Sequence, residues 1–252
     1  MISAMYQSGF TALAHRGGGK EEFENSPRAF RHAMDLGYAV IETDVQVSAD
    51  GTIYIFHDDT LDRTTTGHGV FSAKTDKELA ALTLNNGEAI PRLLDLLTAC
   101  PGVIFNIDVK TDDGIDAMAG FLNTHGHHDR ICLASFSTKR LNQIRRKLDK
   151  PCAMSGGQMD VLRLYLGAFG LPMGRPDVVA AQVPVSAYGL TIITPRFLRH
   201  CRKLDIAVHV WTIDDAAEMT RLIDLGVDGI VTDCPSQLKD IALHKKVWRE
   251  EG

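Results

Sequence analysis

Two histidines in this sequence follow short apolar segments. His15, with Arg16 beside it, comes directly after the apolar segment 10–14, and His57 comes directly after 53–56. An imidazole accepts and donates protons near neutral pH, and a guanidinium binds anionic oxygens. A single histidine at a strand end is more often a structural residue, so acid–base chemistry at this site depends on further groups nearby.

Three carboxylates belong to two other apolar segments. Glu42 and Asp44 are two positions apart within 40–45, so an extended strand places both on one side. Asp108 directly follows the next segment, 103–107, and Lys110 follows Asp108 by two positions. Burying neighbouring carboxylates without a cation is costly. A metal resolves that cost, and all-oxygen ligation favours a hard cation, Mg²⁺ or Ca²⁺, over zinc.

The formal charges of these groups indicate the kind of substrate. The three carboxylates, one divalent metal ion, Arg16 and Lys110 together carry about +1. A phosphodiester carries one negative charge, so the loaded site is close to neutral. Two histidines can then divide the proton transfers, one as base and one as acid. The pattern favours metal-assisted cleavage of a phosphodiester.

The elements that position these groups alternate regularly. Eight short apolar segments recur, each followed by an amphipathic stretch: 10–14, 40–45, 103–107, 131–134, 152–154, 178–181, 208–211 and 229–231. Near-continuous apolar segments of this length are typical of strands in a parallel sheet. Eight such units in 252 residues predict a closed (β/α)8 TIM barrel, with a doubly wound open sheet as the alternative.

One interval breaks this alternation. Residues 53–90 begin with a strand-like segment and continue with sequence rich in aspartate and threonine. We therefore predict a single catalytic domain over 1–252 with a small inserted subdomain at about 53–90, after the second strand. The insertion follows a strand on the face where TIM-barrel active sites lie.

Composition excludes several classes of protein. The net charge of −5 gives no overall positive field for nucleic acid, and 44% of the residues are hydrophobic, as in ordinary globular proteins. No stretch is long and apolar enough for a membrane span, and the segment 1–9 does not resemble a signal peptide. The five cysteines are widely spaced and never form a CxxC pair, which argues against disulfides and a zinc site. We expect a cytoplasmic protein with reduced cysteines and a small-molecule substrate; the sequence does not indicate its oligomeric state.

Several motifs along the chain resemble one known family. They are His15-Arg16-Gly17, Glu24-Asn25-Ser26, Glu42-Thr43-Asp44-Val45, His57-Asp58-Asp59-Thr60-Leu61-Asp62-Arg63-Thr64-Thr65 with Gly67, Val210-Trp211-Thr212, and the segment 226–235. Together they are similar to the glycerophosphodiester phosphodiesterase family, and the similarity covers essentially the whole chain.

This resemblance implies a TIM barrel with an inserted subdomain that hydrolyses glycerophosphodiesters to sn-glycerol 3-phosphate and an alcohol. It implies His15 and His57 as the acid–base pair, Glu42, Asp44 and Asp108 as ligands of a divalent cation (Mg²⁺, Ca²⁺ or Mn²⁺), and Arg16, Lys110 and Trp211 as substrate-binding residues. The family usually has glutamate where this chain has Asp108, so this shorter side chain reaches a cation directly only from a shifted backbone, and otherwise through water.

Three other functions are weighed against this one. A phospholipase D-type enzyme acting on lysophospholipids needs an exposed apolar rim, for which 162–171 is the one candidate stretch; we expect it to be a buried helix instead. A Schiff-base enzyme using Lys110 needs a lowered lysine pKa, which three neighbouring carboxylates oppose. A non-catalytic phosphometabolite-binding barrel needs neither His15 nor His57.

Overall fold

The computed structural model describes residue 6 and residues 9–249. Its central strands are β1 (Thr11–His15), β2 (Val40–Val47), β4 (Ile104–Val109), β5 (Ile131–Ala134), β6 (Ala153–Met154), β7 (Ala180–Val183), β10 (Ala207–Val210) and β11 (Gly229–Thr232). They pair in parallel in the order β6-β5-β4-β2-β1-β11-β10-β7. A parallel bridge between Ser155 and Ala180 joins the two ends of this path. The sheet is thus an almost closed barrel, which confirms the predicted TIM barrel.

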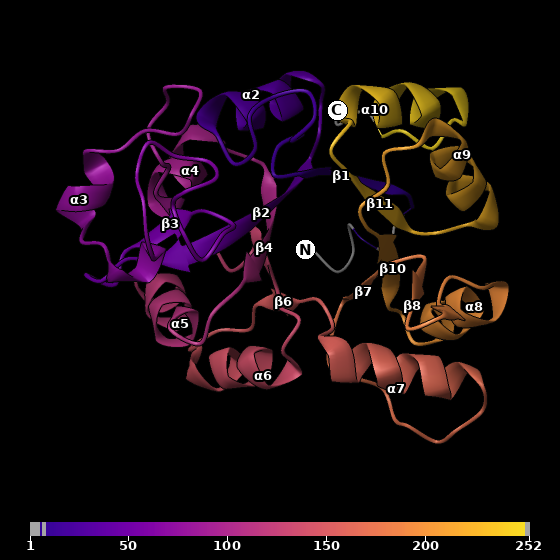
Figure 1. The fold of residues 1–252 in the computed structure, drawn as a ribbon. Helices are drawn as coiled ribbons and strands as arrows, with labels where there is room; N and C mark the ends of the chain where they lie inside the picture. Colours follow the sequence, from indigo (N-terminus) through magenta and orange to yellow (C-terminus); the bar gives the residue numbers. More distant parts are fainter. Residues whose placement is uncertain (1–5, 7–8, 250–252) are drawn as a thin grey trace.

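Helices surround the strands on all sides in Figure 1. They are α2 (Pro27–Asp35), α4 (Leu93–Ala99), α5 (Gly114–His125), α6 (Thr138–Lys147), α7 (Gln158–Ala168), α8 (Pro195–Lys203), α9 (Ala216–Leu225) and α10 (Pro235–His244). The hydroxyls of Ser26 and Thr194 cap α2 and α8 by accepting backbone N–H groups of the first turn, and a proline follows each cap. These local signals fix where α2 and α8 begin.

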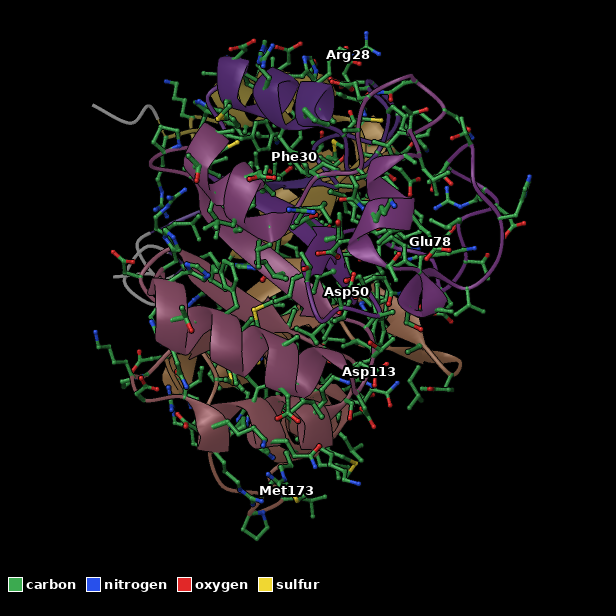
Figure 2. All side chains as sticks on the ribbon, turned by 90° about the vertical axis from the view of Figure 1, so that its left-hand side faces the viewer. Arg28, Phe30, Asp50, Glu78, Asp113 and Met173 are labelled. Atoms are coloured by element: carbon green, nitrogen blue, oxygen red, sulfur yellow. The ribbon has the colours of Figure 1, made fainter. Side chains whose placement is uncertain are left out.

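The amphipathic pattern of α2 shows how the helices attach to the barrel. Phe30 is buried and packs edge-on against Phe105 of β4, with ring centroids 6.3 Å apart. Arg28 on the same helix projects away from the strands (Figure 2). Burying a side chain such as Phe30 stabilises the fold by about 1.5–3 kcal/mol.

Residues 53–90 form a small unit beside the barrel, on the left in Figure 1. It contains β3 (Ile53–Ile55), the 3-10 helix η1 (Phe71–Ala73) and α3 (Asp76–Ala80). β3 pairs antiparallel with the end of β2. The unit has an apolar cluster of its own, made of Tyr54, Phe56, Leu61, Phe71, Leu79, Leu84 and Ile90. A second hairpin, β8 (Ser186–Ala187) with β9 (Leu190–Thr191), follows β7.

The expectation that 162–171 is a buried helix is only partly correct. α7 forms there and buries Leu164, but Leu162, Phe169 and Leu171 are 45%, 55% and 49% exposed. The helix packs by one face only, which leaves Leu162 exposed, and it ends at Ala168, before Phe169 and Leu171.

The five cysteines are free thiols in the structure, and Cys100, Cys132 and Cys201 are buried. Among the described helices, none has the length and apolar character that crossing a bilayer requires. The segment 1–9, where no signal peptide is expected, lies mostly outside the described residues.

Candidate active site

The carboxyl ends of the barrel strands enclose a cavity of about 250 Å³. All eight residues singled out from the sequence line it: His15, Arg16, Glu42, Asp44, His57, Asp108, Lys110 and Trp211. They come from β1, β2 and β4 and from the loops after β1, β3, β4 and β10. In a TIM barrel this is the face where catalytic groups gather.

The carboxylates sit side by side at the floor of this cavity. Glu42 and Asp44 are two positions apart on β2, and Asp44 lies opposite Asp108 in the β2–β4 register. These residues are 8%, 1% and 7% exposed, respectively. Burial, and then the charge of Asp44, raises the pKa of Glu42 to about 7. Glu42 accepts a long hydrogen bond of 3.3 Å from the backbone N–H of Arg16, so its charge is poorly compensated.

Two cationic side chains neutralise the other carboxylates. Lys110 Nζ lies 2.8 Å from Asp44 Oδ1 and 2.7 Å from Asp108 Oδ2. Arg16 Nε lies 3.1 Å from Asp44 Oδ2. Although burial raises the pKa of Asp44, these two cations hold it below its usual value. At Asp108 burial prevails over Lys110, and the pKa is raised.

Each histidine is oriented by a carboxylate at Nδ1. His15 Nδ1 lies 2.7 Å from Asp233 Oδ1, and His57 Nδ1 lies 2.6 Å from Asp58 Oδ1. Hydrogen bonds from Arg63, together with His57 itself, lower the pKa of Asp58 to about 2, so its carboxylate accepts and His57 Nδ1 donates. Nε2 is then the nitrogen of His57 that remains for proton transfer.

Asp233 and Asp58 were not predicted as site residues. Both stand in the motifs quoted above. Asp233 directly follows β11, and Asp58 directly follows His57. A histidine that must present one nitrogen to substrate needs a partner for the other. That requirement is the signal in the sequence that identifies these two carboxylates.

A pair of arginines joins the inserted segment to the barrel at the rim of the site. Glu24 Oε1 lies 3.0 Å from Arg16 Nη1 and 2.6 Å from Arg63 Nη2. Arg63 also contacts Asp58 through Nε at 2.6 Å. Neither Glu24 nor Arg63 was predicted as a site residue.

An apolar wall closes one side of the cavity. The ring of Trp211 packs edge-on against Phe136, with centroids 5.7 Å apart. Phe136, which was not predicted, lines the cavity and is 54% exposed. Phe136 follows the end of β5 by two residues, as His57 follows the end of β3. The cavity therefore has a charged floor and an apolar wall.

The donor set fits a hard divalent cation. Asp108 Oδ1 is buried and has no hydrogen-bond partner among the described residues, and the raised pKa of Glu42 marks an uncompensated carboxylate beside it. Carboxylate oxygens are the ligands that Mg²⁺ and Ca²⁺ prefer. Within residues 9–249 and at residue 6, no three histidine, cysteine or carboxylate groups are already gathered around one point. Lys110 contacts both Asp44 and Asp108, so a cation bound by all three carboxylates requires its ammonium to move.

Comparisons with known proteins agree on one family. The sequence model of the glycerophosphoryl diester phosphodiesterase family matches residues 15–237. A Mycobacterium tuberculosis protein named "Probable glycerophosphodiester phosphodiesterase 2" is 33% identical over 254 residues, which cover 98% of this chain and 96% of that protein.

Two solved structures share the fold. A glycerophosphodiester phosphodiesterase from Agrobacterium tumefaciens superposes with a TM-score of 0.76 at 24% identity, over 93% of this chain and 99% of that one. A phosphodiesterase from Oleispira antarctica, in complex with the product sn-glycerol-3-phosphate, gives 0.78 at 23% identity, over 94% and 98%. At these identities the two structures establish the architecture of the barrel.

Proposed function

The chain belongs to the glycerophosphoryl diester phosphodiesterase family, and from that premise we propose that it hydrolyses glycerophosphodiesters to sn-glycerol 3-phosphate and an alcohol. The observation that carries the proposal is one cavity holding two histidines, each with Nδ1 on a carboxylate, beside a cluster of three carboxylates and two cationic side chains. Acid–base groups in one cavity with cationic side chains that can bind phosphoryl oxygens suit phosphodiester cleavage.

Electrostatics support a divalent cation as part of the site. When ionised, the three carboxylates outnumber Arg16 and Lys110 by one charge, so an anionic diester is repelled unless a cation is bound with it. Glu42, Asp44 and Asp108 would hold Mg²⁺, Ca²⁺ or Mn²⁺. When bound, the ion acts as a Lewis acid for the phosphoryl group.

The protein side chains divide the remaining tasks. Arg16 and Lys110 bind phosphoryl oxygens, because both cationic side chains line the cavity, where each is paired with Asp44. One histidine removes the proton of the attacking hydroxyl, and the other protonates the leaving alkoxide. The attacking group is either the neighbouring glycerol hydroxyl, which gives a cyclic phosphate that water then opens, or water itself. Trp211 and Phe136 form the wall for the apolar parts of the substrate.

The test is release of glycerol 3-phosphate from glycerophosphocholine by the purified protein. We compare EDTA-treated protein with the same sample supplied with Mg²⁺, Ca²⁺ or Mn²⁺, and expect release only with metal. H15A and H57A should lose turnover while keeping the fold. H68A is the matched control, because His68 lies in the inserted unit, bonds Asp62 and is 83% exposed in its side chain. No release with any metal contradicts the reaction, and near-normal kcat in H15A or H57A contradicts the assigned roles.

Phe136 supports a second candidate function, a phospholipase D-type reaction on lysophospholipids. Its exposed ring at the cavity offers an apolar rim, and Met159 is likewise 54% exposed. A backbone hydrogen bond of 3.0 Å from Gln158 N–H to the Phe136 carbonyl oxygen brings the two segments together. Assaying lysophosphatidylcholine beside glycerophosphocholine separates the two functions. If the rim holds an acyl chain, F136A should lower kcat/KM much more for lysophosphatidylcholine than for glycerophosphocholine.

A further inference from the structure

The side chain of Arg63 contacts two carboxylates of different elements with all three of its guanidinium nitrogens. Nε lies 2.6 Å from Asp58 Oδ2, and Nη1 lies 2.9 Å from Glu24 Oε2. Nη2 contacts both carboxylates, at 2.9 Å from Asp58 Oδ1 and 2.6 Å from Glu24 Oε1. This is the fork geometry in which one planar guanidinium fixes two carboxylates at once.

Each of these carboxylates holds a residue of the proposed active site. Asp58 Oδ1, which Arg63 contacts, is the oxygen that holds His57 Nδ1 at 2.6 Å. Glu24 Oε1, which Arg63 also contacts, is the oxygen that holds Arg16 Nη1 at 3.0 Å. Arg16 in turn reaches Asp44 on the floor. A continuous chain of contacts therefore runs from the imidazole of His57 to the guanidinium of Arg16, with Arg63 at its centre.

We propose that Arg63 is a positioning residue that sets His57 and Arg16 relative to each other, and so aligns proton transfer with phosphate binding. The proposal rests on the proposed function. It gives the inserted unit a second task besides supplying His57, because Arg63 and Asp58 come from that unit whereas Glu24 comes from the loop after β1. Arg63 itself lies outside the residues that line the cavity.

The backbone around Arg63 is built to keep this side chain in place. Asn85 Nδ2 donates to the Arg63 carbonyl oxygen at 3.0 Å. Thr64 and Thr65, which follow it, are 6% and 4% exposed. The Thr65 hydroxyl donates to the Leu61 carbonyl oxygen at 2.7 Å. An exposed ion pair alone contributes little to stability. The position of Arg63 is therefore held by these backbone contacts together with the carboxylate oxygens of Asp58 and Glu24 that it contacts.

The test compares R63Q and R63K with a matched control, R221Q. Arg221 is 50% exposed in its side chain, against 51% for Arg63, and it binds Glu218 through two nitrogens at 2.7 Å on the surface of α9. We expect R63Q to lower kcat by about tenfold or more, and to raise KM, because misplacing reacting groups is costly. R63K, which keeps the charge without the fork, should be intermediate. R221Q should match the wild type.

Two further variants give a readout that a general structural role would not produce. D58N removes the charge that holds His57 Nδ1 and should lower kcat, whereas E24Q removes the charge that holds Arg16 and should mainly raise KM. R63Q should combine both defects, and in the double variant D58N/R63Q the loss of kcat should be no greater than that of the worse single variant. Equal kinetics for R63Q and R221Q, or fully additive losses in D58N/R63Q, would overturn the proposal.

A second measurement keeps this result separate from the proposed function. If the wild type releases no glycerol 3-phosphate, the proposed reaction fails, and the geometry is tested by proton NMR of the His57 Nδ1–H that Asp58 binds. R63Q should shift or broaden that resonance, while R221Q leaves it unchanged. A resonance that is identical in R63Q and the wild type overturns the positioning role whether or not the protein is active.

Discussion

His15 Nδ1 lies 2.7 Å from Asp233 Oδ1, although the two residues are 218 positions apart in the chain. The contact forms because the first and last strands of the barrel are neighbours: Ala14 pairs with Thr232 in the β1–β11 register. Asp233 is itself held through its backbone N–H, which donates to Asp214 Oδ1 at 2.8 Å. Closure of the barrel thus supplies the partner that orients the first histidine.

We expect D233N to lower kcat by about tenfold to a hundredfold, because a misoriented imidazole loses much of its acid–base contribution. The amide nearly preserves shape, so thermal unfolding should change little. D224N is the control, since Asp224 binds Lys245 on the surface, away from the cavity, and is 57% exposed in its side chain. Steady-state kinetics on glycerophosphocholine checks the prediction, and a kcat within twofold of the D224N value would contradict it.

Much of this arrangement could be predicted from sequence because it follows from local rules. Apolar segments of strand length, helix caps such as Ser26 and polar residues at strand ends are readable one segment at a time. Once a parallel barrel is assumed, the carboxyl ends of all strands meet at one face, so the cavity-lining positions of Glu42 and Asp108 follow without any knowledge of distances.

The remaining part of the site depends on contacts between distant segments. Glu24, Asp58 and Arg63 meet only after the inserted unit has packed beside the loop after β1, and no periodicity predicts that packing. The same limit applies to Phe136, whose exposure and contact with Trp211 depend on how β5 and β10 are placed around the barrel. Nor does spacing alone predict that Lys110 binds both Asp44 and Asp108.

The pKa of Glu42, raised by burial and then by Asp44 to about 7 from its usual 4.5, has a consequence for stability. Between those two values the folded, metal-free protein binds more protons than the unfolded chain does. The free energy of unfolding therefore falls as pH rises through this window, by roughly 3 kcal/mol for a gap of this size. The stabilising contribution is greatest below pH 4.5 and is lost once pH passes about 7.

In EDTA, the free energy of unfolding of the wild type should fall from pH 5 to pH 8, whereas that of E42Q should lack this loss because the amide does not ionise. The difference between E42Q and the wild type should therefore shift in favour of E42Q as pH rises. Urea unfolding at the two pH values measures the difference. E218Q is the control, because Arg221 lowers the pKa of Glu218. Glu218 is therefore ionised in both the folded and the unfolded chain throughout this range, and the difference between E218Q and the wild type should not change between the two pH values. A gap between E42Q and the wild type that is the same at both pH values would show that Glu42 does not titrate in this range.

Lys110 should compete with a divalent cation for the carboxylates, since its ammonium already contacts Asp44 and Asp108. Removing one positive charge at such a distance favours a second cation by about tenfold or more in affinity. We expect K110Q to bind Mn²⁺ or Mg²⁺ more tightly by calorimetry, while turnover falls because a phosphate ligand is lost. K245Q, which removes a lysine paired with Asp224 on the surface, should bind as the wild type does. Unchanged or weaker binding by K110Q would contradict this competition.

The two histidines should differ in role, with His15 as the general acid. Burial lowers the pKa of His15, but Glu42 at 3.8 Å and Asp233 outweigh it, and the pKa is raised above 6.5. A histidine that keeps its proton is suited to protonating the leaving alkoxide. A p-nitrophenol leaving group needs no such proton, because its oxyanion is already stable near neutral pH.

This difference predicts a substrate-dependent defect. With glycerophosphocholine both H15A and H57A should be severely impaired. When the leaving group is p-nitrophenol, the defect of H15A should shrink by about tenfold or more, whereas that of H57A should persist because the attacking hydroxyl still has to lose its proton. The ratio of kcat/KM values on the two substrates, measured for each variant against the wild type, decides the assignment. Rescue of H57A instead of H15A would reverse the two roles, and equal rescue of both would mean that neither histidine acts only on the leaving group.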